Sequence, residues 1–311
     1  MFDIVGKRHW YFLISGLIIV PGVIAMIYST IRFGTPVRLG IDFTGGALLE
    51  LQFEQPVPPA QVRQVFVDYG YSDTAAQTTA GEKNILIRTK PLDSETKTEI
   101  EAALEEAFGP LTELRFESVG PTVGREVART ALVAVFMVSL AILGFIVLAF
   151  QKVPNPFRYG VCAIAATLHN ILVSLGLFSI FGLLFGWEVD ALFLTALLTV
   201  IGFSVQDTIV VFDRIRENIP KRRGEPFETI VNRSLLETLH RSLATQLNAM
   251  FVLVAILLFG GATMKQFILV LLIGLLTGTY SSIFDAVPLL VVWEKREIGR
   301  FFQRLRGQAA A

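Results

Sequence analysis

Six long apolar runs constrain this chain more than any other feature of its sequence. Each run is close to the length of about 20 residues that a helix needs to cross roughly 30 Å of hydrocarbon. The runs cover residues 10–31, 130–150, 159–184, 191–212, 243–261 and 267–293. Only 17% of the residues are charged, against about 25% in a soluble domain. The sequence therefore predicts a polytopic α-helical membrane protein with six transmembrane helices, and it excludes an ordinary soluble enzyme.

The positions of Lys and Arg predict the orientation of these helices. Basic residues gather before the first run, between the second and third, between the fourth and fifth, and after the sixth: Lys7, Arg8, Lys152, Arg158, Arg214, Arg216, Lys221, Arg222, Arg223, Arg233, Lys295, Arg296, Arg300, Arg304 and Arg306. The other two short connections hold Lys265 alone. Since cytoplasmic loops carry the excess of Lys and Arg, we expect both termini in the cytoplasm.

The long connection between the first two runs has the composition of a soluble domain. Residues 32–129 contain 15 of the 27 acidic and 10 of the 27 basic residues. Its apolar periodicity predicts the order β-α-β-β-α-β, which is the ferredoxin-like α+β arrangement. We thus divide the chain into a cytoplasmic N-terminus with helix 1 (1–31), an extracytoplasmic domain (32–129), transmembrane helices 2–6 (130–293) and a cytoplasmic tail (294–311).

Two glycine-containing motifs flank this domain. Residues 40–46 read G-I-D-F-T-G-G, and residues 119–124 read V-G-P-T-V-G. Neither matches the phosphate-binding patterns G-x-x-x-x-G-K-[ST] or G-x-G-x-x-G, and glycine permits backbone angles that are closed to other residues. We interpret both motifs as tight domain junctions, with Gly40, Asp42, Gly45, Gly46, Gly120, Pro121 and Gly124 as the residues concerned.

A carboxylate within the fourth run is the strongest candidate for a functional group. Asp207 lies about 24 Å from the outer end of that run, at roughly 1.5 Å per residue, and an ionisable residue at such depth is costly and usually functional. The polar residues Ser204, Gln206 and Thr208 surround it in the sequence. A group whose protonation depends on which side water enters is what proton coupling needs. The alternative is an aspartate that serves helix packing alone.

Other polar residues in the apolar runs have weaker interpretations. Asp285, in the sixth run, is a second relay carboxylate, a partner for a neighbouring subunit, or a tolerated group beside Pro288, and we rank the structural interpretations first. His169 and Asn170 in the third run favour a hydrogen-bonded core pair over a relay.

Residues 40–46, 119–124 and 203–218 together resemble the SecF family of protein-export membrane subunits, and the resemblance covers nearly the whole chain. It implies half of a transporter of the resistance-nodulation-division (RND) type, with SecD supplying the other half, in a bacterial cytoplasmic membrane. It also implies that Asp207 and Arg241 take part in proton transport, with Thr245 completing an Arg-x-x-x-Thr stretch. This chain departs from the family pattern at Gln206, Ala244 and Gln246.

From this resemblance we expect an accessory subunit that uses the proton motive force to promote late steps of preprotein translocation. The expected partners are SecD, the SecYEG translocon with SecA, the preprotein at the outer domain and membrane lipids, with YajC and YidC as further candidates and no nucleic acid. We expect no enzyme activity, because H-E-x-x-H, G-x-S-x-G and Walker lysine motifs are absent, and no metal or cofactor besides the proton.

Two alternatives remain: half of an RND-type exporter of small molecules or lipids, and a translocon scaffold that transports nothing. Arg241 itself also fits a membrane-surface anchor.

Overall fold

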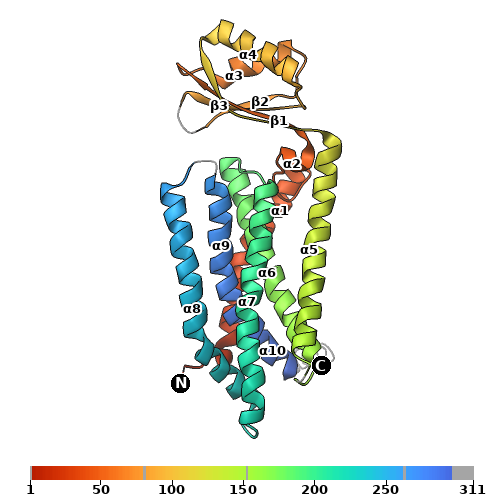
Figure 1. Ribbon diagram of the computed structural model, residues 1–311, viewed down its shortest axis with the longest axis vertical. Coiled ribbons are helices and arrows are strands. Elements are labelled where there is room, and N and C mark those ends of the chain that lie inside the picture. The colour runs from red at the N-terminus through yellow and green to blue at the C-terminus, as the bar shows by residue number, and fades with distance from the viewer. Residues whose placement is uncertain (1, 80–81, 152, 262–263, 296–311) are drawn as a thin grey trace, which may run out of the picture. The chain divides into compact units, whose positions relative to one another are not determined.

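The structure is a computed structural model that describes residues 2–79, 82–151, 153–261 and 264–295 (Figure 1). Most of the tail that the sequence assigns to the cytoplasm, from residue 296 onward, lies outside the described residues. The chain forms two compact units. One comprises residues 39–133, and the other combines residues 1–38 with residues 134–311.

The smaller unit is built on a four-stranded antiparallel sheet with the strand order β2-β3-β1-β4. Its elements are α2 (Ile41–Thr44), β1 (Gly46–Phe53), α3 (Pro59–Asp68), β2 (Ala75–Thr78), β3 (Asn84–Thr89), α4 (Ser94–Phe108) and β4 (Leu111–Val119). In the central strand β1, Leu49 lies opposite Ile87 of β3 and Phe116 of β4. This order confirms the predicted ferredoxin-like α+β fold.

One apolar core joins the sheet to its two helices. Its members include Leu51, Phe53, Val62, Phe66, Ile100 and Leu104, each at most 1% exposed. The helix α4 begins where the carboxylate of Asp93 accepts a hydrogen bond of 2.8 Å from the backbone N–H of Thr96. Such a cap satisfies an N–H group that has no partner within the helix. The α+β unit thus has its own apolar core, and the start of α4 is fixed by a cap within the unit.

Six helices in the described part of the chain are long and apolar enough to cross a membrane, which confirms the six predicted runs. They are α1 (Arg8–Phe33, after a 3-10 turn at Val5–Lys7), α5 (Pro121–Ala149), α6 (Pro156–Phe185), α7 (Ala191–Lys221), α8 (Phe227–Phe259) and a last run of α9 (Lys265–Ser281), a π-helical turn (Ser282–Ala286) and α10 (Val287–Glu294). The helix α8 begins well before its apolar run, because its first turns bury Val231 and Leu235 in the core at that end of the bundle.

The helices differ in how much of their apolar surface the chain itself covers. Half of the most apolar stretch of α7 is buried, against 6% for α5 and 11% for α8. In Figure 1, α7 runs between α8 and α5 and beside α6 and α9. The surfaces of α5 and α8 are therefore left for lipid or for another chain.

Small residues let two pairs of helices come close together. A Cβ atom added at Gly22 of α1 would lie 2.7 Å from the Cα atom of Gly176 in α6. A Cβ atom at Gly278 of α9 would lie 3.2 Å from Cβ of Ser204 in α7. Contacts of this kind between small residues are typical of transmembrane helix packing, and the second one brings the polar face of α7 against the last span.

Candidate functional site

The helix α7 carries three polar side chains on one buried face. Ser204, Asp207 and Thr208 are three and four residues apart, which places them on the same side of a helix, and their exposed fractions are 2%, 5% and 1%. Gln206 lies on another face and is exposed. The structure therefore brings two of the three predicted supporting residues to the side of α7 that carries Asp207.

The carboxylate of Asp207 has an uncharged partner. The side-chain amide Nε2 of Gln246, from α8, donates a hydrogen bond of 2.7 Å to Oδ2 of Asp207. Within the described residues, no Lys or Arg forms an ion pair with this carboxylate. The negative charge of Asp207 is thus held by an amide in a buried site, where an ionised carboxylate is expensive unless a proton or cation neutralises it.

Hydroxyl groups tie three helical segments together next to Asp207. Ser282 of the π-helical turn donates to the backbone carbonyl of Ser204 (2.9 Å), and Thr208 donates to the hydroxyl of Ser282 (3.0 Å). Asn170 of α6 donates through Nδ2 to the hydroxyl of Ser204 (2.7 Å). A change in charge at Asp207 therefore occurs beside a network that connects α6, α7 and the last span.

A second buried carboxylate lies in the π-helical turn. Oδ1 of Asp285 accepts a hydrogen bond of 2.7 Å from the hydroxyl of Ser15 in α1, and Oδ2 lies 3.4 Å from Nε2 of His169 in α6. Pro288 follows in the next turn and lacks the N–H that an α-helix would require, which accounts for the wider turn at this point. The sequence singled out Asp285 and His169 but not Ser15, and it gave no sign that the three residues meet.

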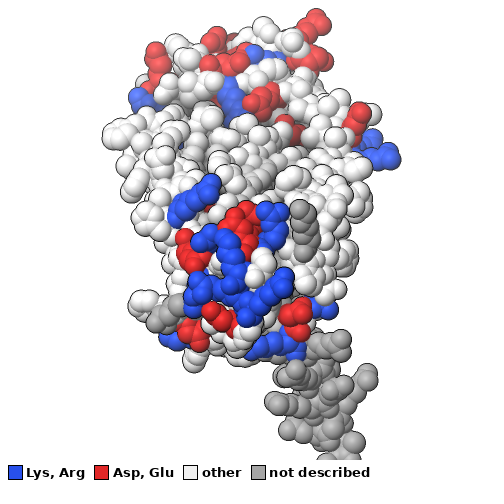
Figure 2. All heavy atoms as spheres, turned by 60° about the horizontal axis from the view of Figure 1, so that its bottom comes forward, with Lys and Arg blue, Asp and Glu red and all other residues white. Residues whose placement is uncertain are grey.

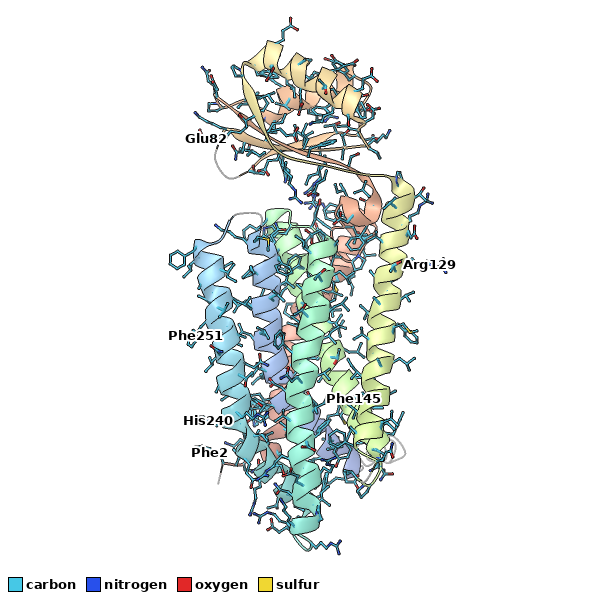
Figure 3. All side chains as sticks on the ribbon, viewed as in Figure 1. Phe2, Glu82, Arg129, Phe145, His240 and Phe251 are labelled. Atoms are coloured by element: carbon cyan, nitrogen blue, oxygen red, sulfur yellow. The ribbon has the colours of Figure 1, made fainter. Side chains whose placement is uncertain are left out.

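Arg241 and Thr245 lie on the exposed surface of α8. The hydroxyl of Thr245 donates to the backbone carbonyl of Arg241 (2.9 Å), and within the described residues the side chain of Arg241 forms no ion pair. Figure 3 shows the neighbouring His240, and Phe251 further along, directed away from the bundle. The structure therefore does not bring Arg241 to Asp207, whose partner is Gln246, one of the positions at which the chain departs from the family pattern.

The two glycine motifs contact each other through their backbones. A Cβ atom at Gly45 would lie 2.7 Å from Cα of Pro121, and one at Gly124 would lie 2.7 Å from the backbone nitrogen of Gly45. Gly45 and Gly46 also have positive φ angles, of 75° and 134°. In the same motifs, the carbonyl of Gly40 accepts the N–H of Thr44.

The remaining junction residues lie next to this contact in the sequence. Asp42 belongs to the short helix α2, Gly120 precedes α5, and Pro121 begins it. The two motifs thus form one junction, in which the chain packs α2 against the start of α5 at a separation that a side chain would prevent.

Charged side chains cover the end of the helical unit where α7 ends and α8 begins (Figure 2). Arg214 pairs with Glu237 (2.6 Å), and Arg222 and Arg233 both pair with Glu225 (3.2 and 3.5 Å). Arg8 pairs with Glu228 at the start of α8 (2.6 Å). The basic residues of this end are therefore organised in an ion-pair network.

Comparisons with known proteins place the chain in one family. A family model described as "Protein export membrane protein SecD/SecF, C-terminal" matches residues 99–296, and a second, the "SecD/SecF GG Motif", matches residues 33–57. The protein translocase subunit SecF of Thermobaculum terrenum is 50% identical over the full length of both chains, and that of Anaerolinea thermophila is 49% identical.

Larger fused proteins contain the same arrangement. The chain is 34% identical to the protein translocase subunit SecDF of Bacillus subtilis, covering 95% of this chain and 38% of the other. The crystal structure of the translocon-associated SecDF from Thermus thermophilus superposes with a TM-score of 0.79 at 31% identity, over 94% of this chain and 39% of that chain. These similarities span nearly the whole sequence, and we conclude that the chain belongs to the SecF branch of the SecD/SecF family of protein-export membrane proteins.

Proposed function

We propose that this chain couples the proton motive force to protein export, with Asp207 as the group that binds and releases the proton. Its family membership makes it a multi-pass membrane protein, a non-enzymatic subunit of the Sec protein translocase that works with SecD. One observation carries the coupling proposal: Asp207 is 5% exposed, lies within an apolar helix, and has an amide as its partner. Such a carboxylate changes its interactions strongly when it takes up a proton.

The available energy sets how the coupling can work. One elementary charge that crosses 100 mV supplies about 2.3 kcal/mol, and each pH unit adds about 1.4 kcal/mol. A two-state element needs about 5.5 kcal/mol to move from 1:99 to 99:1. At 100 mV and one pH unit a proton supplies about 3.7 kcal/mol, so a shift of that full size would take more than one proton per cycle under these conditions. In this scheme protonation of Asp207 releases its contact with Gln246 and shifts α7 against α8, and no covalent bond is made or broken.

Arg241 enters this scheme through a rotation of α8. Ser242 and Gln246 are buried on one side of α8. Arg241 immediately precedes Ser242, and Thr245 immediately precedes Gln246. One residue corresponds to about 100° around a helix. A rotation of that size would exchange Gln246 for the face that bears Arg241 and Thr245. We propose Arg241 as the cation that stabilises the charged form of Asp207 in such a state.

The surroundings of the site support the wider assignment. The ion-pair network of basic residues at one end of the bundle fits a cytoplasmic surface. On this basis we propose that both termini lie in the cytoplasm and that the α+β domain (32–129) lies outside, in contact with the emerging preprotein. The uncovered apolar faces of α5 and α8 fit helices of SecD. We further propose SecYEG with SecA, YajC and YidC as partners in a bacterial cytoplasmic membrane, and late steps of translocation as the stage at which the chain acts.

The test is preprotein translocation into inverted membrane vesicles, with and without an imposed proton gradient. Asp207→Asn keeps the size of the side chain but cannot exchange a proton, so we expect the gradient-dependent fraction to be lost while the amount of assembled complex is unchanged. Asp213→Asn is the matched control, because Asp213 lies on the same helix but is half-exposed and paired with Arg216 at 2.6 Å. Full gradient stimulation in Asp207→Asn would refute the coupling role and favour a scaffold.

A further inference from the structure

His169 of α6 and Asp285 of the π-helical turn face each other in the membrane-spanning core. Nε2 of His169 lies 3.4 Å from Oδ2 of Asp285, and both residues are 8% exposed. Neither of these two atoms has a hydrogen-bond partner among the described residues. Two buried polar atoms without partners, 3.4 Å apart, require an explanation, because a buried polar group without a hydrogen bond destabilises the fold.

The neighbouring hydrogen bonds determine where the ring of His169 carries its proton. Asn170 donates through its amide nitrogen Nδ2 to the hydroxyl of Ser204 (2.7 Å). Its amide oxygen therefore faces Nδ1 of His169, at 3.3 Å. An amide oxygen only accepts, so with the amide in this orientation Nδ1 is the donor. In a neutral imidazole with a proton on Nδ1, Nε2 bears a lone pair.

A lone pair on Nε2 would then point at a carboxylate oxygen. The other oxygen of Asp285 already accepts a hydrogen bond from Ser15, so the orphan atoms Nε2 and Oδ2 are both acceptors. A single proton between them satisfies both, as imidazolium with carboxylate or as imidazole with carboxylic acid. We infer that His169 and Asp285 jointly bind one proton and form a second proton-binding site in the core, separate from Asp207.

The groups around the pair are consistent with a net neutral site. The ring of Tyr280, in α9, stacks on the ring of His169 with 6.2 Å between the ring centroids. The hydroxyl of Tyr280 donates to the backbone carbonyl of Tyr11 in α1 (2.8 Å). The hydroxyl of Ser15 lies 3.5 Å from that of Tyr280. These tyrosines are the titratable groups that α1 and α9 contribute. The described part of the chain supplies no Lys or Arg to the pair, so the shared proton itself balances the charge of Asp285.

The helix α7 contributes the remaining contacts. Ser204 reaches the pair indirectly through Asn170, and Asp207 follows one turn later on the same face. Within the described residues no hydrogen bond connects Asp207 to His169 or Asp285. The π-helical geometry at Asp285 adds a second reason to assign a role here, since such turns are frequent at functional sites. This assignment concerns proton binding and holds whether or not Asp207 couples transport.

The small number of histidines makes the site measurable. The chain has three, and His9 and His240 are exposed. Solid-state NMR of the full chain with its SecD partner in lipid bilayers, labelled with ¹⁵N-histidine, thus gives three ring systems, and His169→Gln identifies the buried one. We expect Nδ1 of His169 to be protonated throughout the neutral pH range. We expect Nε2 to be protonated or to accept a strong hydrogen bond.

Variants separate this site from Asp207. In Asp285→Asn the new amide donates to Nε2, so the ring should keep its proton on Nδ1 and lose the proton that it shares with Asp285. Asp207→Asn should leave the signals of His169 in place, even where gradient-driven translocation is lost. A bare Nδ1 with a protonated Nε2 in the wild-type protein would overturn the inference. So would His169 signals that are unchanged by Asp285→Asn. The wild-type ring signals of His169 decide the matter if Asp285→Asn does not assemble.

Discussion

Gly45 offers a quantitative test of the junction between the two glycine motifs. Its backbone has φ 75° and ψ 163°, a region that is essentially restricted to glycine, and a side chain there costs about 1–3 kcal/mol. In Gly45→Ala the new Cβ atom would also lie 2.7 Å from Cα and 2.9 Å from the nitrogen of Pro121. Overpacking of this kind costs about 1–3 kcal/mol. We therefore expect the substitution to destabilise the α+β domain by about 2–6 kcal/mol, the sum of the two terms.

Two other glycines of the same domain separate the two contributions. Gly109 has φ 86° and ψ −174°, and no atom lies within 4 Å of an added Cβ, so Gly109→Ala should show the backbone cost alone. Gly120 has no positive φ angle and open space around its Cβ position. Gly120→Ala should therefore stay within about 0.5 kcal/mol of wild type.

Hydrogen exchange of the central β1 amides measures these differences in the full chain, because exchange there requires opening of the domain core. A difference of about 1.4 kcal/mol corresponds to a tenfold change in rate. We expect Gly45→Ala to accelerate exchange by at least about 25-fold, and by at least about fivefold more than Gly109→Ala. Equal rates in these two variants would show that Pro121 moves aside freely, and the argument for a close junction would be refuted.

Two further predictions concern the cap of α4 and the contact between α1 and α6. The N–H of Thr96 donates to the carboxylate of Asp93 and lowers the pKa of Asp93 below its ordinary value of 3.8. Because the folded pKa lies below the unfolded one, the charged cap stabilises the fold at neutral pH, and this additional stabilisation is lost as the pH falls below about 3.8. Asp93→Ala should therefore accelerate hydrogen exchange in α4 at pH 7 and have a smaller effect in strong acid; an effect of equal size in acid would contradict this explanation. Gly22→Ala places a Cβ atom 2.7 Å from Cα of Gly176 and should cost about 1–3 kcal/mol, measured as a lower Tm of the purified chain. Gly16→Ala in the same helix has open space around it and should not lower the Tm, so equal Tm values for the two variants would rule out a tight contact.

The parts of the fold that depend on local properties could be predicted from the sequence. A transmembrane helix needs length and hydropathy, and both are visible in each apolar run. The periodicity of the apolar residues also predicts the order of strands and helices along the α+β domain. The spacing of Ser204, Asp207 and Thr208 also fixes their common face, because it depends only on the geometry of one helix.

The contacts between helices could not be predicted in the same way. Gln246 reaches Asp207 because of the way α8 is oriented about its own axis when it packs against α7. No local sequence pattern determines that orientation. The same orientation of α8 leaves Arg241 exposed, although the family resemblance links Arg241 to Asp207. His169 and Asp285 meet because α6 packs against a π-helical turn. From the sequence the glycine motifs are interpreted as two separate tight junctions, whereas in the fold they bring two distant backbone segments into contact with each other.

The central claim is that a proton passes through Asp207, and proton flux tests it most directly. The chain and its SecD partner are placed in liposomes that contain a pH-sensitive dye, and a membrane potential is imposed. Our account predicts proton entry in the wild-type complex and in Asp213→Asn, and none above background in Asp207→Asn. Proton entry at the wild-type rate in Asp207→Asn would contradict the account, since the proton would then follow a path that does not include this carboxylate.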